Sequence, residues 1–239
     1  MSTPRPASTI VSADEPVTAP AAVLWDMDGT LVDSEPYWMA TERELALEHG
    51  GTWSDEQALG MVGQEITFTA RSLREQAGVA GTDDEIAERL VSRVAARIRH
   101  GGPPWRPGAR ELLDALTAAG VPCALVTMSY REMAQAVLDS LPAGTFAAVV
   151  TGDEVTHGKP HPEPYLAAAR LLGVDIGRCV AIEDSVPGVA SAEASGAATI
   201  AVPLMVDIPP APGRTLLPSL AGVTVADLGR VAAAHLTNH

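Results

Sequence analysis

Apolar and polar positions form two patterns along the chain, and the second pattern predicts a layered sheet. From Pro107 onward, short apolar runs typical of buried strands alternate with segments typical of helices. The expected strands are 122–127, 146–151, 179–183 and 198–202, and the expected helices are 108–119, 130–140, 162–172 and 187–195. Repeated strand–helix units of this length predict a parallel sheet with right-handed crossovers. After Asp207 the pattern weakens, and we expect a short strand at 223–225 and a final helix over 226–236.

Another strand is expected near the start of the chain, separated from the others by a helical region. Residues 22–25 are apolar without polar alternation, as in a strand that is buried on both faces of a parallel sheet. The polar region that follows contains no convincing strand. Helices are expected there from Pro36 to Gly50, at the capping-box sequence Ser54–Gln57, over 65–77 and over 83–99.

These patterns predict an α/β fold class, with a Rossmann-like parallel sheet core and an inserted helical cap domain. We assign residues 21–34 and 105–239 to the core and residues 35–104 to the cap. Residues 1–20 are rich in Pro, Ala, Ser and Thr and have no apolar period, which predicts a disordered tail.

Composition restricts the kind of protein. The 239 residues are 46% hydrophobic, which is enough for a sizeable core, and a globular enzyme is the default class. A formal net charge of −14 argues against nucleic acid and anionic membrane partners, because both require a basic face. We find neither a membrane-length apolar run nor a basic leader. Cys123 and Cys179 lie in apolar runs, which is typical of reduced core residues. We therefore predict a cytoplasmic protein. We expect a monomer or a weak dimer.

Two carboxylates directly follow the first predicted strand. Asp26 and Asp28 lie two positions apart, so a roughly extended chain would point both side chains into one pocket before Gly29 allows a turn. Facing carboxylates repel each other, and a raised pKa or a bound hard cation such as Mg²⁺ relieves the repulsion. The four residues Asp26-Met27-Asp28-Gly29 also fit a turn that caps a helix. An EF-hand calcium loop fits poorly, because Gly29 is the fourth residue of the segment and not the sixth.

Polar residues also end other predicted strands. Thr127 and Ser129 follow one strand, Glu183 and Asp184 follow another, and Lys159, the only lysine of the chain, precedes a helix. Because the carboxyl ends of parallel strands share the edge of the sheet where ligands bind, we expect these residues in one pocket with the two aspartates. Four carboxylates in one pocket need positive charge, which Mg²⁺ and Lys159 would supply, and Thr127 and nearby N–H groups can hold phosphate oxygens. A phosphate ester fits this set best.

Two histidines and two aromatic residues lie close to these positions. His157 and His161 flank Lys159, and we interpret them as side chains that a proline-containing loop displays to solvent, not as metal ligands. Tyr37 and Trp38 open the first cap helix near the expected mouth of the pocket. They either pack or touch substrate, and the sequence leaves both interpretations open.

Four short motifs, in order and at compatible spacing, resemble those of a known enzyme family. They are Asp26-Met27-Asp28-Gly29-Thr30, Thr127, Gly158-Lys159-Pro160-His161-Pro162, and Glu183-Asp184-Ser185 followed by Gly188. Together they are similar to the motifs of the haloacid dehalogenase superfamily of aspartate-dependent phosphohydrolases. The subgroup they resemble has a helical cap after the first motif and includes the β-phosphoglucomutase-like sugar phosphatases. The resemblance covers about residues 21–205.

The resemblance implies a catalytic role for each matching residue. Asp26 would be the nucleophile that takes the phosphoryl group as an aspartyl phosphate. Asp28 would protonate the leaving alcohol and then activate water. Lys159 and Thr127 would neutralise the oxygens of the transferring phosphoryl group, which is the main electrostatic contribution in phosphoryl transfer.

The resemblance also implies a metal site and a phosphate site. The implied Mg²⁺ ligands are Asp26, the backbone carbonyl of Asp28, Asp184, and Glu183 directly or through water. The implied substrate-binding residues are Thr127, Met128, Ser129 and Lys159.

The leading hypothesis is therefore a Mg²⁺-dependent phosphatase that hydrolyses a small phosphorylated metabolite. The expected class of substrate is a sugar phosphate. The alternative is a sugar phosphomutase of the β-phosphoglucomutase type, which would need a cationic cap residue to bind a second phosphate. In related mutases an Arg lies three residues after a cap Gly that aligns with Gly63, and this chain has Ile66 there. Arg71 and Arg74 lie more than one helical turn further along, which weakens the mutase hypothesis without removing it.

Other activities fit less well. Dehalogenases of the superfamily lack the second aspartate of the first motif, whereas Asp28 is present here. Phosphonate-cleaving members use a cap lysine, and this cap contains none. A phospho-accepting signalling domain also combines an acidic pocket with Thr or Ser and Lys. The cap, the Asp-x-Asp spacing and the chain length make it a remote alternative.

Overall fold

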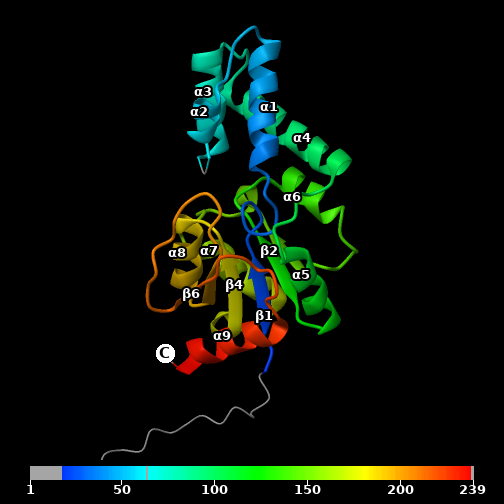
Figure 1. Ribbon diagram of the computed structural model, residues 1–239, viewed down its shortest axis with the longest axis vertical. Coiled ribbons are helices and arrows are strands. Elements are labelled where there is room, and N and C mark those ends of the chain that lie inside the picture. Colours follow the sequence, from blue (N-terminus) through cyan, green and yellow to red (C-terminus); the bar gives the residue numbers. More distant parts are fainter. Residues whose placement is uncertain (1–17, 63, 238–239) are drawn as a thin grey trace, which may run out of the picture.

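The computed structural model describes residues 18–62 and 64–237, which form a sheet-based core below a group of helices (Figure 1). Within this part of the chain, six parallel strands form one sheet in the order β3-β2-β1-β4-β5-β6. The strands are β1 (Ala22–Trp25), β2 (Cys123–Val126), β3 (Ala148–Val150), β4 (Cys179–Glu183), β5 (Ala198–Ala201) and β6 (Arg214–Leu216). The predicted α/β fold class with a Rossmann-like parallel sheet is confirmed. The order places β1, which leads into Asp26, in the middle of the sheet.

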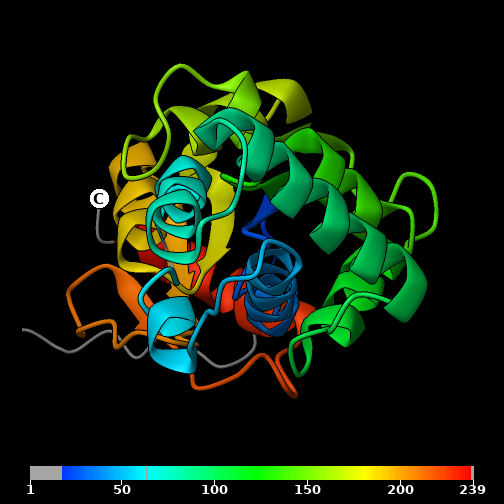
Figure 2. The ribbon, with the colours of Figure 1, turned by 90° about the horizontal axis from the view of Figure 1, so that it is seen from above.

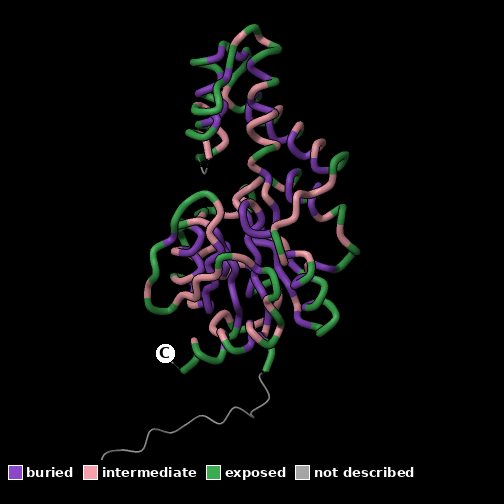
Figure 3. Tube along the Cα trace, viewed as in Figure 1, coloured by how far each residue is buried: buried purple, intermediate pink, exposed green. Residues whose placement is uncertain are grey.

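Strand β1 is apolar throughout because both of its faces are covered. All four of its residues are buried, and it pairs with β2 through Val23↔Cys123 and with β4 through Val23↔Val180 (Figure 3). Successive side chains of a strand point to opposite faces, so Val23 and Trp25 join one core cluster and Leu24 joins another.

Helices form a layer on each face of the sheet. They are α5 (Ala109–Ala118), α6 (Arg131–Leu138), α7 (Glu163–Leu172), α8 (Val186–Ser195) and α9 (Val225–Thr237). Buried residues of α5, α6 and α9 lie in the cluster around Trp25, whereas buried residues of α7 and α8 lie in the cluster around Leu24. Two short 3₁₀ turns, Gly152–Glu154 and Ile176–Arg178, lie in the connections. The result is the three-layer arrangement that parallel strands with crossover helices produce.

The cap consists of four described helices, α1 (Glu35–Glu48), α2 (Asp55–Leu59), α3 (Ile66–Ala77) and α4 (Asp83–Gly101). Seen from above, these helices lie over the end of the core (Figure 2). They enclose a small core of their own, in which Leu45, Trp53, Leu73 and Leu90 are buried. The predicted capping box at Ser54 is present. The second half of α4 leaves this small core and joins the main cluster with α6.

Two neighbouring segments connect the cap to the core. The Asp33 N–H donates to the Pro104 carbonyl at 2.8 Å, and the Arg106 N–H donates to the Leu31 carbonyl at 3.0 Å. These bonds lie at the two predicted boundaries between the core (21–34 and 105–239) and the cap (35–104). The division itself stays a prediction from the sequence.

The C-terminal part corrects one expectation. The strand predicted at 223–225 is wrong, and a strand that the sequence pattern missed, β6, lies earlier in the chain. Thr224 instead precedes helix α9, where its N–H donates to Asp227 Oδ2 at 2.8 Å and its Oγ accepts from the Asp227 N–H at 3.2 Å. A β-branched run that looked strand-like therefore caps a helix.

Two further expectations concern the tail and the membrane. Of the tail predicted for residues 1–20, residues 1–17 lie outside the described residues, and Pro20 is buried. None of the helices over 18–62 and 64–237 combines the length and the apolar character needed to cross a membrane.

Candidate active site

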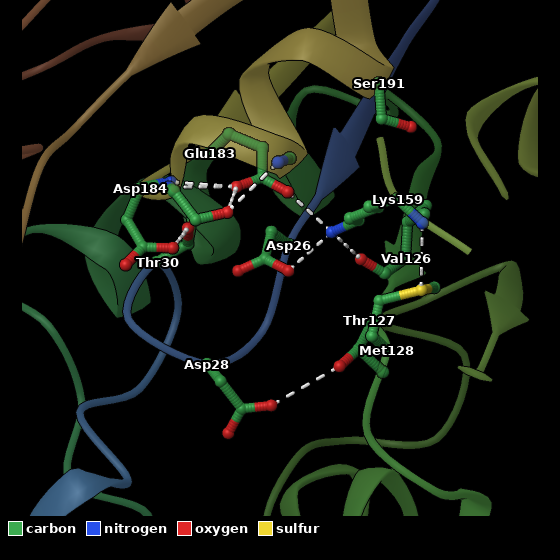
Figure 4. Close-up of polar contacts among 12 residues, drawn as sticks. Asp26, Asp28, Thr30, Val126, Thr127, Met128, Lys159, Glu183, Asp184 and Ser191 are labelled. Atoms are coloured by element: carbon green, nitrogen blue, oxygen red, sulfur yellow. Dashed lines mark hydrogen bonds and ion pairs between the residues drawn. The ribbon is translucent and has the colours of Figure 1, made fainter. Parts of the chain in front are cut away.

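The predicted site residues converge beyond the carboxyl ends of the central strands (Figure 4). Asp26 follows β1 directly, and its N–H donates to the Ile182 carbonyl of β4 at 3.0 Å. Glu183 ends β4, and Lys159 reaches the same place from the loop before α7. Parallel pairing of β1 with its two neighbours therefore brings together residues that are more than 150 positions apart in the sequence.

Lys159 lies between two carboxylates. Its Nζ donates to Asp26 Oδ1 at 2.6 Å, to Glu183 Oε1 at 2.5 Å and to the Val126 carbonyl at 2.9 Å, so all three ammonium protons have an acceptor. The Lys159 side chain is only 5% exposed. Burial alone would lower the pKa of Lys159, but Asp26 and Glu183 outweigh that effect and raise it above its ordinary value. The ammonium is thus charged and fixed in position.

Glu183 holds this lysine in place. It is fully buried, and its Oε1 also accepts from the Tyr165 hydroxyl at 2.9 Å. Its Oε2 accepts from the N–H groups of Asp184 at 3.0 Å and Ser185 at 3.2 Å, and from the Ser185 hydroxyl at 3.1 Å. A Cβ on Gly188 would lie 1.9 Å from Glu183 Oε1, so only glycine fits beside this carboxylate. Both oxygens of Glu183 already have donors.

Asp26, Glu183 and Asp184 form the acidic centre of the site. Ligand oxygens from these three side chains lie within 4.8 Å of one another. Asp26 Oδ2 is buried without a hydrogen-bond partner, and Asp184 Oδ1 accepts from the Thr30 hydroxyl at 3.2 Å. Burial, followed by the charge of Glu183, raises the pKa of Asp26 well above its ordinary value and that of Asp184 to about 7. A crowded carboxylate set with an unpaired buried oxygen is the donor set that a hard divalent cation requires.

Gly29 allows this centre to form. Its φ is +87°, in the left-handed region that favours glycine, and a Cβ there would lie 2.0 Å from Asp184 Oδ2. The turn after Asp28 and the approach of Asp184 therefore both depend on the missing side chain.

The Asp28 carboxylate lies apart from the acidic centre (Figure 4). Three hydroxyl groups donate to it. Its Oδ1 accepts from the Ser34 hydroxyl at 2.5 Å, and its Oδ2 accepts from the hydroxyls of Ser129 at 2.7 Å and Thr127 at 3.4 Å. Burial raises the pKa of Asp28, and these hydroxyl bonds oppose the shift. The four predicted carboxylates thus divide into a group of three and a separate Asp28 that is placed to hold a proton.

The loop after β2 supports both Asp28 and the lysine. Thr127 Oγ1 accepts from the Ser129 N–H at 3.0 Å, which keeps these two hydroxyls together. The Lys159 N–H points to the Met128 sulfur at 3.3 Å, and a Cβ on Gly158 would lie 2.9 Å from the same sulfur. The Met128 side chain therefore lies under the lysine loop.

Two residues at the cap entrance pack against the core. Tyr37 and Trp38 are partly buried beside the main cluster, and the Tyr37 hydroxyl donates to the Gly102 carbonyl at 3.2 Å. Sequence reasoning missed Ser34, which donates to Asp28, and Tyr165, which donates to Glu183. A tyrosine inside a helix gives no signal of its own, and only the packing of α7 on the sheet brings its hydroxyl to Glu183.

The family is decided by a comparison with known proteins. A family model for haloacid dehalogenase-like hydrolases matches residues 20–196. The chain belongs to this family. Relatives of this haloacid dehalogenase-like hydrolase include hexitol phosphatase B and N-acetylmuramic acid 6-phosphate phosphatase, and the chain is a phosphoric monoester hydrolase.

Three similar proteins illustrate the range of this hydrolase family. Hexitol phosphatase A of Escherichia coli is 36% identical over 78% of the chain and 84% of its own length. The bifunctional riboflavin kinase/FMN phosphatase of Arabidopsis thaliana is 33% identical over 77% of the chain, which spans only 48% of that longer protein. A CbbY mutant from Rhodobacter sphaeroides, crystallised with xylulose 1,5-bisphosphate, has a TM-score of 0.76 at 27% identity, covering 87% of this chain and 99% of CbbY.

Proposed function

We propose that the protein is a Mg²⁺-dependent phosphatase of a small phosphorylated metabolite, a sugar or sugar-alcohol monophosphate, and that it acts through an aspartyl-phosphate intermediate. The arrangement of Asp26 carries the proposal. One oxygen of this carboxylate is held by Lys159, while the other is buried without a donor. The free oxygen lies in a set of carboxylates suited to a cation. An anionic group that needs both a metal and an ammonium fits this place.

The groups present account for both halves of hydrolysis. Asp26 attacks phosphorus, the bond from phosphorus to the ester oxygen breaks, and Asp28 gives its proton to the departing alcohol. Asp28, now a carboxylate, removes a proton from water, which attacks the aspartyl phosphate and releases phosphate and free Asp26. Lys159 and the Thr127 hydroxyl face the charge on the phosphoryl oxygens. Bound by Asp26, Asp184 and the Asp28 carbonyl, Mg²⁺ would neutralise that charge further.

The raised pKa of Asp28 supports its role as an acid. A carboxyl group with a raised pKa holds its proton more strongly than an ordinary aspartic acid and can donate it to an alkoxide, and the hydroxyls of Ser34 and Ser129 orient it. The role of Glu183 as a metal ligand, direct or through water, remains part of the proposal. Its filled hydrogen bonds favour the indirect form.

The cap arginines support a substrate with a single phosphate. Arg71 Nε pairs with Asp83 Oδ2 at 3.0 Å, and Arg74 Nε pairs with Asp83 Oδ1 at 2.8 Å. Ile66, the position that aligns with the phosphate-binding arginine of the related mutases, packs in the apolar clusters. The two arginines that follow Ile66 in the sequence are thus already paired with a carboxylate. A substrate whose non-phosphate part carries only uncharged hydroxyl groups fits this cap better than one with a second phosphate. The name hexitol phosphatase implies such a substrate for a relative.

A substrate panel tests the proposal. Phosphate release should be fastest from hexitol or hexose monophosphates with Mg²⁺, slower from hexose bisphosphates, and absent in the Asp26→Asn variant. Asp207→Asn, which alters an exposed carboxylate, is the matched control and should keep wild-type rates. With β-glucose 1-phosphate as substrate, the 6-phosphate isomer could appear faster than free phosphate. That result would overturn the phosphatase proposal in favour of the mutase alternative.

Location and partners complete the proposal. The protein is proposed to be cytoplasmic and monomeric or weakly dimeric. The net charge of −14 supports a protein that binds neither nucleic acid nor anionic membranes.

A further inference from the structure

A second group of metal-binding side chains lies on the outside of the lysine loop. His157, His161 and Glu163 bring one ligand atom each within 4.8 Å of one another. His157 Nδ1 lies 2.9 Å from Glu163 Oε2, and the two imidazole rings are 4.7 Å apart between centroids. From the sequence alone we interpreted the two histidines as displayed to solvent and not as metal ligands, and the structure gives reason to reverse the second part of that interpretation. The structure adds a carboxylate from the first turn of α7.

The backbone around these side chains is already ordered by hydrogen bonds. Glu163 Oε1 accepts from the Thr156 N–H at 2.8 Å, and Oε2 accepts from the His157 N–H at 3.0 Å. The His161 N–H donates to the Gly158 carbonyl at 3.0 Å, and the His161 carbonyl accepts from the Ser191 hydroxyl at 2.6 Å. A carboxylate ligand that also accepts backbone N–H bonds is typical of metal sites, because such bonds fix its orientation. The ligand side chains are therefore held close to the positions in which a metal would bind them.

The ligand types select the metal. Two imidazoles and one carboxylate suit Zn²⁺, whereas Mg²⁺ prefers oxygen ligands alone. Zinc ligands at about 2.0–2.2 Å from the metal lie roughly 3.3–3.6 Å from each other in a tetrahedron, so the His157–Glu163 contact would open by a few tenths of an ångström. A surface depression of about 500 Å³ adjoins His161 and Glu163.

We propose that His157, His161 and Glu163 form a Zn²⁺ site, separate from the catalytic Mg²⁺ position, that clamps the loop carrying Lys159. The two histidines lie two residues before and two residues after the lysine. A metal that binds both of them together with α7 would restrain the segment between them. The proposal is independent of which phosphate ester the enzyme hydrolyses.

Zinc titration by calorimetry, in saturating Mg²⁺ to occupy the catalytic position, tests the site. Wild type should bind one Zn²⁺ per chain, and His157→Gln and His161→Gln should each weaken binding by about tenfold or more. His100→Gln removes an exposed histidine of α4 and should bind as wild type does. Asp184→Asn, which alters the catalytic cluster, should also keep the Zn²⁺ site.

Hydrogen exchange provides the second measurement. Zinc should protect the N–H groups of the non-proline residues between 156 and 163 in wild type and in His100→Gln, but not in His157→Gln. Unchanged zinc affinity in both loop-histidine variants would overturn the proposal. Zinc binding that disappears only in Asp184→Asn would also overturn it, because the metal would then lie in the catalytic cluster.

Discussion

At the residue scale, the site depends on how one buried carboxylate is satisfied. Glu183 accepts from Lys159, Tyr165, Ser185 and the Asp184 N–H, so its charge is distributed over several donors. An unpaired buried charge costs several kcal/mol, whereas a fully hydrogen-bonded one fixes the geometry of its partners. The donors to Glu183, which do not face substrate, therefore fix the position of the Lys159 ammonium relative to Asp26.

Tyr165→Phe tests this support. The substitution removes a hydroxyl that donates to Glu183 at 2.9 Å and keeps the ring, which lies 5.1 Å from Lys159 Nζ. We expect a loss of about 1–3 kcal/mol in the free energy of unfolding, measured in urea, because a buried acceptor loses one donor. We also expect kcat to fall with KM nearly unchanged. Tyr130→Phe, at the exposed start of α6, is the control, and equal behaviour of the two variants would argue against the supporting role.

At the element scale, the cap helices are joined by a buried carboxylate outside the active site. Glu42 of α1 is 3% exposed and accepts from the Trp53 indole N–H at 2.9 Å, just before α2. Burial raises the pKa of Glu42 from 4.5 to about 7, although the indole hydrogen bond opposes the shift. The cap core therefore favours the protonated form of this side chain.

A pH dependence of stability follows from Glu42. Between about pH 4.5 and 7 the folded protein binds more protons at this residue than the unfolded chain, so its contribution to stability falls as pH rises through that window. Glu42→Gln keeps an acceptor for Trp53 and removes the charge. We expect the variant to be more stable than wild type above pH 7, with little difference near pH 4, in urea unfolding followed by circular dichroism. Glu88→Gln, on the exposed face of α4, should show no such difference.

At the scale of the whole molecule, the pattern of apolar runs predicted the sheet well because each parallel strand is buried on both faces and reads as an uninterrupted apolar segment. The order of the motifs was enough to predict that Asp26, Lys159 and Asp184 meet. Contacts that depend on tertiary packing carried no local signal, and so Tyr165 and the contribution of Glu163 were missed. The edge strand β6 was missed for a related reason, because its side chains are only half-buried.

Magnesium should affect the whole molecule as well as its rate. A cation that binds the folded acidic centre but not the unfolded chain stabilises the fold by about 2.7 kcal/mol at a concentration one hundred times its dissociation constant. We therefore expect a chelator to stop phosphate release and Mg²⁺ to raise the unfolding temperature, with Ca²⁺ restoring little activity because it favours a larger oxygen shell. Asp184→Asn should abolish the Mg²⁺-induced shift in calorimetry. A shift of wild-type size in that variant would place the metal elsewhere.

The solitary lysine has a consequence for chemical labelling. Reagents that acylate side-chain amines have a single target in this sequence, and that amine is 5% exposed and bound to three acceptors. Acylation of Lys159 then requires the loop to move away from β2 and β4 and the ammonium to lose its proton. The rate at which Lys159 itself takes up such a label, read from its peptide, therefore measures how often the catalytic centre opens.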